Sequence, residues 1–222
     1  LDEDGHSAPQ IAVTRLLRGG PGAEPFRSST NIYDDFINFL ITNGGYTEKT
    51  DVGNGTLSGT LFPCPYDWRL DVQELTTTLE ACVDDALMAN PDSDKVDIVG
   101  HSTGGLVARA YVAKKGAAKI NKIIYLATPH EGSPRAFNAL AYDDGLVPNF
   151  VDFGRFLGTA IINNQTMSGL AKTFPSVFQL LPRYPFVWDP QKSRKLNLKT
   201  ETYIDTFMTT LHLPKADALH NQ

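Results

Sequence analysis

The sequence predicts an α/β fold, in which a mostly parallel sheet carries helices on both faces and a mainly helical region follows. Three observations support this prediction. Beyond residue 30, helical and strand patterns alternate, with turn residues between them, and this order is typical of a parallel sheet wrapped by helices. At residues 96–115 a β-branched run passes through a Gly-rich turn into a helical pattern. After about Gly145 the strand patterns stop, and aromatic residues stand among Gly and Pro.

The N-terminal part contains one predicted helix. Residues 1–30 are rich in Gly, Pro and Ser, and their single short apolar stretch, residues 11–17, could form an edge strand. Thr30 or Asn31 is expected to cap a helix that ends at Gly44-Gly45.

A strand and a second helix are predicted next. Residues 56–62 have the pattern of a strand, which Pro63 ends. Asp71-x-x-Glu74 resembles a capping box and is expected to open a helix that ends near Pro91. The apolar stripe of this helix consists of Val72, Leu75, Leu79, Val83 and Leu87.

The pattern Gly100-x-Ser102-x-Gly104 follows a short strand at residues 96–99. In a nucleophile elbow, a serine sits on a strained turn between a strand and a helix, and its hydroxyl projects above the sheet. Glycines leave room for such a turn where a Cβ would collide with neighbouring backbone. The helical pattern after the turn ends at Gly116. Ser102 is therefore the candidate nucleophile, and the alternative is an ordinary Gly-rich turn.

A further strand is predicted at residues 122–127. Reactive residues of parallel sheets gather at the carboxyl ends of the strands. Three such ends are recognisable, at residues 63–69, 100–104 and 128–134. We expect them to lie side by side.

These patterns divide the chain into a partial core at residues 1–145 and a cap-like region at residues 146–222. Two interpretations of the second region remain open. It is either a cap whose apolar side chains hold an acyl chain or a set of short helices with a small core of their own. Its aromatic residues are Phe150, Phe153, Phe156, Phe174, Phe178, Phe186 and Trp188.

Composition restricts the possible partners. A chain of 222 residues with net charge −5 is long enough for one α/β domain. Its densest basic run is Lys192-Ser-Arg194-Lys195, which argues against nucleic acid, because phosphate binding needs several convergent cations. No apolar run approaches the roughly 18 residues of a membrane span. Nothing in the sequence marks an oligomer, and the oligomeric state is left open.

Cys64 and Cys82 are the only cysteines, and they could form a disulfide or remain free. Asn54-Gly-Thr56 and Asn164-Gln-Thr166 are glycosylation sequons of a kind that also arises by chance. No signal peptide is visible, although the chain begins with Leu1 and its true N-terminus is expected to lie upstream. Localisation is therefore not fixed by the residues.

Several blocks together resemble the lecithin:cholesterol acyltransferase family. Phe62-Pro-Cys-Pro-Tyr-Asp-Trp-Arg69 is similar to the Pro-Tyr-Asp-Trp-Arg signature of that family, and residues 96–112 resemble its nucleophile block. Residues 123–134 (IIYLATPHEGSP) and 175–184 (PSVFQLLPRY) resemble segments that follow in the family. The resemblance runs from about Ile32 to Tyr184. The Pro-Tyr-Asp-Trp-Arg block is specific, whereas Gly-x-Ser-x-Gly alone fits any α/β-hydrolase.

The resemblance implies an α/β-hydrolase that moves a fatty acyl group from a lipid ester to water or to an alcohol. Ser102 would be the nucleophile, and the backbone N–H of Thr103 would be one oxyanion-hole donor. Serine acyl transfer needs no metal or other cofactor, and none is expected. Contact with a membrane or lipoprotein surface, and an extracytoplasmic or membrane-associated location, are expected of the family.

Other polar residues near the motifs have less specific interpretations. His101 should point away from Ser102, and His130 is expected to be a turn residue, so neither is the favoured base. Asp67 and Arg69 are expected to form a buried pair that fixes their loop, with direct substrate contact as the alternative. Tyr66 and its neighbour Trp68 could line a pocket but are more often core residues.

The rest of a catalytic triad is not recognisable. An acid and then a His should follow Ser102 from separate strand ends, whereas Asp217 and His220 are only three residues apart. The early segment Gly19-Gly20-Pro21-Gly22 does not convincingly supply the second oxyanion donor. The sequence is therefore interpreted as an internal fragment, incomplete at both ends, that lacks its acid and base and is inactive by itself.

Three functions remain as hypotheses. The leading one is a lipid O-acyltransferase or phospholipase-type hydrolase. The second is a general lipase, an esterase or a glycolipid-anchor deacylase, because such enzymes share the Thr-Pro-His-x-Gly-Ser block at residues 128–133. The third is a non-catalytic lipid-binding protein that kept the fold and lost the triad.

Overall fold

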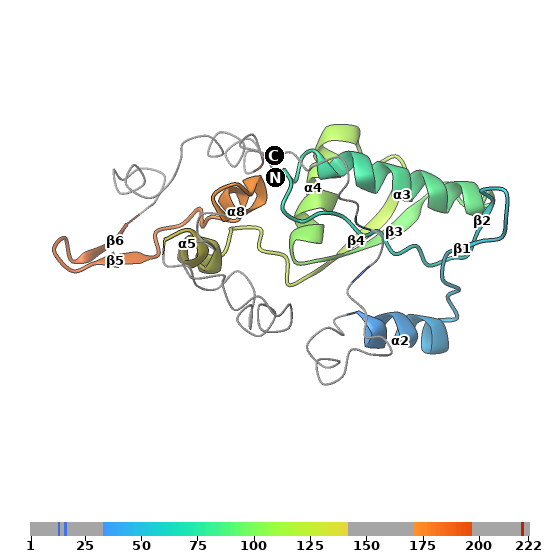
Figure 1. Ribbon diagram of the computed structural model, residues 1–222, viewed down its shortest axis with the longest axis horizontal. Helices are drawn as coiled ribbons and strands as arrows, with labels where there is room; N and C mark the ends of the chain where they lie inside the picture. Colours follow the sequence, from blue (N-terminus) through green and yellow to red (C-terminus); the bar gives the residue numbers. More distant parts are fainter. Residues whose placement is uncertain (1–12, 14–15, 17–32, 142–170, 197–218, 220–222) are drawn as a thin grey trace, which may run out of the picture.

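The computed structural model describes residues 13, 16, 33–141, 171–196 and 219 (Figure 1). Within these residues the chain is a mixed α/β protein with helices and three two-stranded sheets. The elements, in order, are α2 (Asp34–Gly44), β1 (Thr50–Asp51), β2 (Leu57–Ser58), α3 (Leu75–Ala89), β3 (Val96–His101), α4 (Thr103–Lys115), β4 (Ile120–Leu126), α5 (Pro134–Ala141), α8 (Pro175–Gln179), β5 (Val187–Asp189) and β6 (Arg194–Leu196).

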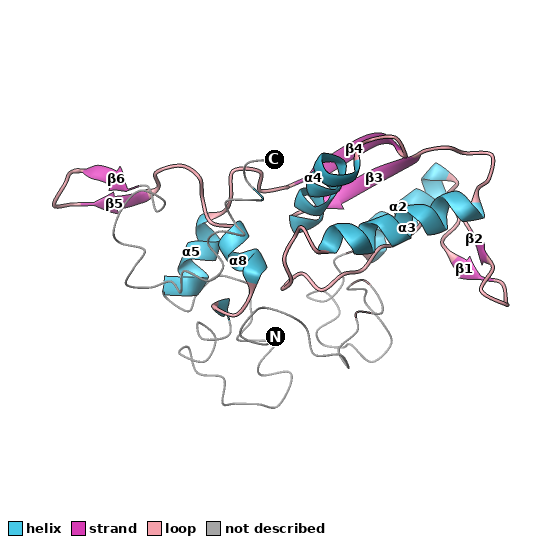
Figure 2. Ribbon diagram, turned by 90° about the horizontal axis from the view of Figure 1, so that it is seen from above, coloured by secondary structure: helices cyan, strands magenta, loops and turns pink. Residues whose placement is uncertain are grey.

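The central unit is the parallel pair β3–β4 with the helices α3 and α4. In the register of the pair, His101 lies opposite Leu126. Helices α3 and α4 pack on β3 and β4, and Figure 2 shows both helices beside these strands. The apolar cluster between them contains Val83, Tyr111 and Ile120, with partly buried Leu79, Leu87, Val96, Ile98, Val112 and Ile123 packed against it. The predicted strand, turn and helix at residues 96–115 are confirmed.

Helices α2, α3 and α4 end where the sequence predicts. Gly45 follows α2 in the left-handed conformation, with φ 70°, and its N–H donates to the carbonyl of Leu40. Gly116 follows α4, and its N–H donates to the carbonyl of Val112. Glycine suits the position after α2 because a positive φ costs it little. The predicted caps of α2, Thr30 and Asn31, lie outside the described residues. The residue preceding the helix is Tyr33, whose side chain makes no capping hydrogen bond.

The predicted capping box at Asp71 and Glu74 is wrong. Helix α3 begins at Leu75, and Glu74, directly before it, has helical backbone angles and makes no side-chain cap bond. The Asp71 carboxylate accepts a hydrogen bond from the N–H of Gln73 at 2.8 Å. It also accepts one from the side-chain amide of Gln179, 108 residues further along the chain, at 2.8 Å. The contact between Gln179 and Asp71 forms only in the folded chain, so the local sequence pattern does not reveal it.

The strand predicted at residues 56–62 is much shorter and belongs to a different sheet. Only Leu57–Ser58 form a strand, which pairs antiparallel with β1. An isolated parallel bridge joins Glu48 to Leu61. The predicted parallel sheet is therefore confirmed for β3 and β4, whereas this segment forms a hairpin. Asn54 of the first sequon lies exposed at the hairpin turn, and Asn164 lies outside the described residues.

A second apolar cluster joins α5 to the segment around α8. Its buried residues are Ala136, Phe137, Leu140, Ala171, Val177, Phe178 and Leu181. The strands β5 and β6 follow as an antiparallel hairpin, so the expectation that strands stop after Gly145 is wrong. Among the aromatic residues of the cap-like region, Phe178 is fully buried and Trp188 is exposed, while Phe150, Phe153 and Phe156 lie outside the described residues.

The second cluster is fastened to the central unit by a buried amide and an aromatic contact. The Oε1 atom of Gln179 accepts the N–H of Val72 at 2.9 Å, and both residues are 0% exposed. The rings of Trp68 and Phe174 meet edge to face, with centroids 5.7 Å apart. Because a buried amide needs partners for both its oxygen and its nitrogen, Gln179 holds α8 in one place on the loop before α3.

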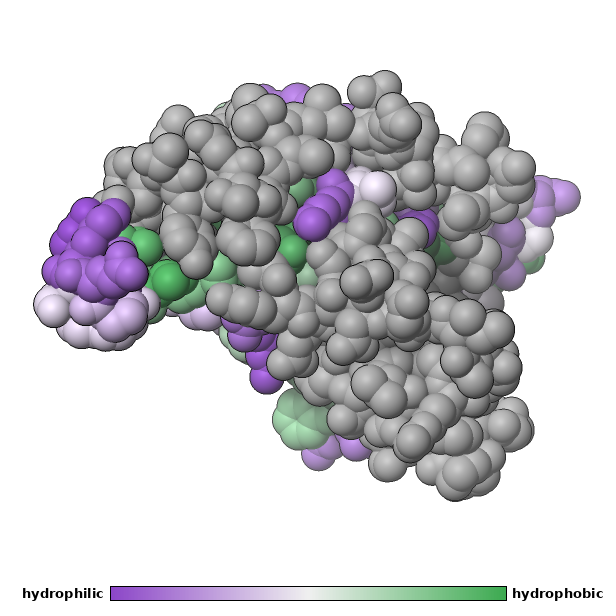
Figure 3. Space-filling model, turned by 60° about the vertical axis from the view of Figure 1, so that its left-hand side comes forward, coloured by the Kyte–Doolittle hydropathy of each residue, from purple (hydrophilic) through white to green (hydrophobic). Residues whose placement is uncertain are grey.

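Several large apolar side chains of the described part are exposed. Val99 of β3 and Ile124 of β4 are 41% and 45% exposed. Figure 3 shows hydrophobic residues of the described part next to strongly hydrophilic ones on one face of the molecule. No helix within the described ranges is both long and apolar enough to cross a membrane.

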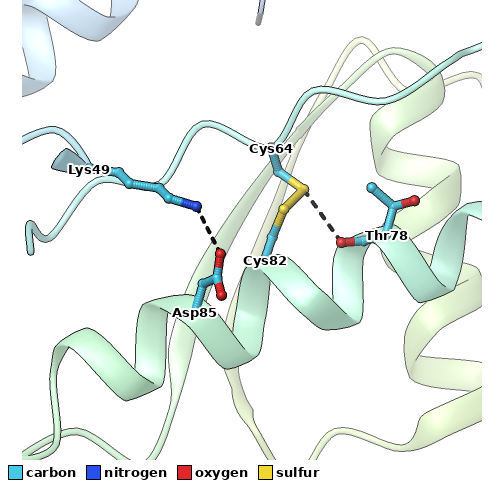
Figure 4. Close-up of a disulfide and its surroundings, with 5 residues drawn as sticks. All are labelled: Lys49, Cys64, Thr78, Cys82 and Asp85. Carbon is cyan, nitrogen blue, oxygen red and sulfur yellow. Dashed lines mark hydrogen bonds and ion pairs between the residues drawn. A yellow bond between two sulfur atoms is a disulfide. The ribbon is translucent and has the colours of Figure 1, made fainter. Parts of the chain in front are cut away.

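Cys64 and Cys82 form a disulfide, with Cα atoms 6.0 Å apart (Figure 4). Cys82 lies on α3 and Cys64 on the loop before it, so the bond ties this loop to the helix. Close by, the ammonium of Lys49 forms an ion pair with Asp85 of α3 at 2.8 Å. The sequence left the pairing of the cysteines open, and the structure shows it.

We expect the double variant Cys64→Ser/Cys82→Ser to unfold more readily than the native chain. The bond closes a loop over a sequence separation of 18 residues, and closing a loop of this size restricts the unfolded chain by about 3 kcal/mol. Urea unfolding of both proteins, with and without reductant, measures the loss. Reductant should shift the native chain toward the variant and leave the variant unchanged. Equal unfolding midpoints for the two oxidised proteins would contradict the prediction.

Candidate active site

Ser102 occupies the turn between β3 and α4 in a strained conformation. Its φ is 53° and its ψ is −126°, a combination that a residue with a Cβ adopts rarely and at a cost of about 1–3 kcal/mol. The turn is held on both sides. The N–H of Ser102 donates to the carbonyl of Leu126 at 2.8 Å, and the N–H of Gly105 donates to the carbonyl of Ser102 at 3.1 Å. The neighbouring backbone therefore fixes the serine in this conformation.

Glycines around Ser102 provide the space that this turn needs. A Cβ on Gly100 would lie 2.7 Å from the Cα and 2.8 Å from the N of Gly105. The collision with backbone expected for Gly100 is thus confirmed. At Gly104 the expectation is wrong in detail, because a Cβ there would meet the hydroxyl of Tyr66 at 3.3 Å rather than backbone. The sequence did not single out Gly105, whose Cβ would come within 2.8 Å of three side-chain atoms of Thr128.

Thr103 is the first residue of α4. The first amides of a helix have no carbonyl partner within the helix, and the helix dipole makes this end electropositive. The N–H of Thr103 therefore belongs to a group of donors that favours negative charge beside Ser102. This is the position in which a tetrahedral intermediate on Ser102 would need a donor.

The three predicted strand ends meet around this turn. Thr128 follows β4, and its hydroxyl donates to the carbonyl of Gly100 at 3.3 Å. Tyr66, from the Pro-Tyr-Asp-Trp-Arg loop, reaches Gly104 from another side. Segments 63–69, 100–104 and 128–134 therefore lie together as expected, although the first follows a hairpin rather than a strand of the β3–β4 sheet.

Asp67 and Arg69 form the expected pair, although both side chains are only partly buried rather than buried. The Nε and Nη2 atoms of Arg69 donate to the two carboxylate oxygens of Asp67 at 2.8 and 2.5 Å, and the N–H of Arg69 donates to Oδ1 at 3.1 Å. Burial raises the pKa of the Asp67 carboxyl, but the hydrogen bonds and charge of Arg69 outweigh it, so this pKa lies below its usual value. The carboxylate thus stays ionised and holds the loop in shape.

The two histidines near the turn have partners other than Ser102. His101 accepts or donates a hydrogen bond at Nδ1 with the hydroxyl of Tyr33, at 3.1 Å. The Nδ1 atom of His130 lies 3.4 Å from a guanidinium nitrogen of Arg109. Within the described part of the chain, no imidazole is hydrogen-bonded to Ser102. The expectation that neither histidine is the base stays a prediction.

Two residues of this region were missed by the sequence analysis. The ring of Tyr33 packs edge to face against the ring of His101, with centroids 5.7 Å apart. Arg109 lies on α4, and its Nε is buried without a hydrogen-bond partner in the described part of the chain. No sequence signal separates either residue from its neighbours in the chain. The candidates Asp217, His220 and Gly19–Gly22 lie outside the described residues.

The described residues contain no group of three or more His, Cys, Asp and Glu side chains suited to a metal ion. The candidate site has three parts, which are the strained Ser102, the N-terminus of α4, and Tyr66 on the loop that the Asp67–Arg69 pair holds in shape. The model of the family described as lecithin:cholesterol acyltransferase matches residues 31–218.

The chain belongs to the lecithin:cholesterol acyltransferase family. The match covers the Pro-Tyr-Asp-Trp-Arg loop, the serine turn and the segment around α8, and it confirms the resemblance seen in the sequence. No curated protein and no solved structure matches the chain. Membership of the lecithin:cholesterol acyltransferase family indicates an α/β-hydrolase type of fold and acyltransferase or esterase activity on lipid esters in general.

Proposed function

We propose that the chain carries the nucleophile of a serine-dependent acyl transfer on lipid esters. The observation that supports this most is the backbone of Ser102, held at φ 53° and ψ −126° between β3 and α4. A strained serine at such a turn projects its hydroxyl toward a substrate. Strain of this kind is retained where function needs it. Ser102 is the proposed nucleophile, and the N–H of Thr103 is the proposed oxyanion donor.

The proposed reaction has two steps. Ser102 Oγ attacks the ester carbonyl carbon, a base takes the hydroxyl proton, and the alcohol leaves with a proton as the C–O bond breaks. Water or a second alcohol then attacks the acyl-enzyme and releases Ser102. The base and its acid partner come from outside the described residues in this proposal. Hydrolysis and transfer differ only in which acceptor reaches the acyl-enzyme.

We also propose that the chain has two functional parts. Residues 1–145 form the partial α/β-hydrolase core, and residues 146–222 form a cap that contacts the acyl chain. The buried attachment of Gln179 to the loop before α3 supports a cap fixed beside the site. The disulfide Cys64–Cys82 supports an extracytoplasmic location, because disulfides persist in oxidising compartments.

A fluorophosphonate probe tests the proposal directly, because it reacts covalently with an activated serine. The full-length protein, which supplies the base, is incubated with the probe, digested and analysed by mass spectrometry. We expect one adduct, on the peptide that contains Ser102, and slower labelling when phosphatidylcholine vesicles compete. An unlabelled Ser102 in a folded chain would contradict a catalytic role.

A non-catalytic lipid-binding protein is the second candidate. The observation that favours it is the absence of an imidazole bonded to Ser102 among the described residues. The labelling experiment separates the two candidates, because vesicle binding without an adduct at Ser102 supports the binding protein.

A further inference from the structure

Tyr66 lies beside the serine turn on a loop that a disulfide and an ion pair hold in place. The disulfide anchors the loop to α3 through Cys64, and the Asp67–Arg69 pair braces it from within. The ring of Tyr66 packs against the apolar cluster that includes Leu106 and Val107 of α4. A Cβ on Gly104 would lie only 3.3 Å from the Tyr66 hydroxyl. The hydroxyl therefore lies over the first turn of α4, two residues after Ser102.

The Tyr66 hydroxyl differs from that of its neighbour Tyr33. Tyr33 is bonded to His101 at 3.1 Å, whereas the Tyr66 hydroxyl has no hydrogen-bond partner among the described residues. Burial raises the pKa of the Tyr66 phenol, and the nearby Tyr33 raises it further, so the phenol keeps its proton. The Tyr66 side chain is only partly buried, and its hydroxyl oxygen is not one of the fully buried polar atoms without a partner in the described part of the chain. Solvent therefore reaches the hydroxyl, and a substrate at this place would supply the acceptor.

We propose that the Tyr66 hydroxyl is a catalytic residue of this site, a second donor to the oxygen of the reacting ester. The proposal rests on the proposed function of Ser102. The hydroxyl and the N–H of Thr103 lie at the same end of α4, where the helix dipole favours negative charge. When Ser102 attacks, the carbonyl oxygen becomes negative and accepts hydrogen bonds from both donors. No proton is transferred from Tyr66.

Gly104 also fits this assignment. It has no close backbone neighbour that excludes a side chain, and the group that a Cβ would approach is the Tyr66 hydroxyl. Alanine at this position would therefore displace the Tyr66 hydroxyl and leave the surrounding backbone in place. A tyrosine that merely filled space would tolerate a shift of a few tenths of an ångström, but a donor to a developing oxyanion would not.

The test measures hydrolysis of p-nitrophenyl butyrate by the full-length protein and its variants Ser102→Ala, Tyr66→Phe and the control Tyr46→Phe, whose tyrosine lies exposed after α2. Removing one oxyanion donor costs about 10²–10³-fold in kcat in comparable sites, so Tyr66→Phe should lower kcat by about 10²-fold. KM should stay within about twofold, because the bond forms in the transition state rather than on substrate binding. The melting temperature should not fall, since the lost hydroxyl has no partner in the fold. Tyr46→Phe should change kcat by less than about threefold.

Gly104→Ala gives a second, independent readout. It should lower kcat in the native chain and have a much smaller effect in the Tyr66→Phe background, where the hydroxyl that it displaces is gone. Additive losses in the double variant would overturn the assignment. So would a Tyr66→Phe variant that keeps its kcat, that changes only KM, or that loses stability together with activity.

The outcomes also separate this inference from the proposed function. Turnover that disappears in Ser102→Ala but survives unchanged in Tyr66→Phe overturns the role of Tyr66 alone. A full-length protein without Ser102-dependent turnover contradicts the proposed function, and the role of Tyr66 falls with it.

Discussion

Replacing Ser102 with alanine is expected to lower kcat for a short-chain ester by about 10⁴- to 10⁶-fold, the range seen when a serine nucleophile is removed. Without the hydroxyl no acyl-enzyme forms, and the remaining rate comes from the N–H donors at the start of α4. The measurement is steady-state hydrolysis of p-nitrophenyl butyrate, with probe labelling followed in parallel. A variant that keeps more than a tenth of the native rate would show that another group carries the reaction.

A matched variant, Ser102→Gly, separates the loss of the nucleophile from a loss of fold. Ser102 is held at a φ of 53°, and alanine in its place suffers the same strain, so Ser102→Ala should unfold like the native chain. Glycine adopts positive φ freely and should recover part of the strain, about 1 kcal/mol. Both variants should be inactive, while thermal unfolding places Ser102→Gly above Ser102→Ala. Equal stability of the two variants would argue against strain at this turn.

The sequence predicts the serine turn well because its determinants are local. The strand before Ser102, the glycines within the turn and the helix up to Gly116 lie within about 20 consecutive residues, and each can be recognised by its pattern. The meeting of segment 128–134 with this turn follows from a general rule on strand ends. Segment 63–69 follows a hairpin outside the β3–β4 sheet, so that rule does not account for its position. The Asp67–Arg69 pair is local too, because its two members are two residues apart.

The errors concern contacts between distant parts of the chain. The Asp71 carboxylate accepts hydrogen bonds from Gln73 and Gln179 instead of forming a capping box. Only the fold brings Gln179 close to it. The strands β5 and β6 have three residues each, which is too short for a period-two pattern to emerge. The pairing of Cys64 with Cys82 depends on the loop returning to α3. The position of the Tyr66 hydroxyl over Gly104 also depends on how this loop packs against α3.

Replacing Gly100 with alanine should strongly destabilise the fold. The added Cβ would lie 2.7 Å from Gly105 Cα and 2.8 Å from its N, and both are atoms of the α4 backbone. A flexible side chain could rotate away, but this backbone is fixed by the hydrogen bond from Gly105 N–H to the carbonyl of Ser102. We expect a loss of about 3 kcal/mol, at the upper end of the usual cost of overpacking.

Gly45→Ala is the matched control for this prediction. Gly45 has a φ of +70°, but nothing lies within 4 Å of the Cβ that alanine would add. This variant should cost about 1 kcal/mol for the left-handed conformation alone, and it should leave activity intact because Gly45 ends α2. Urea unfolding and ester hydrolysis are measured for both variants. If Gly100→Ala lost no more stability than Gly45→Ala and stayed active, close contact between β3 and α4 would not be what holds Ser102 in its strained position.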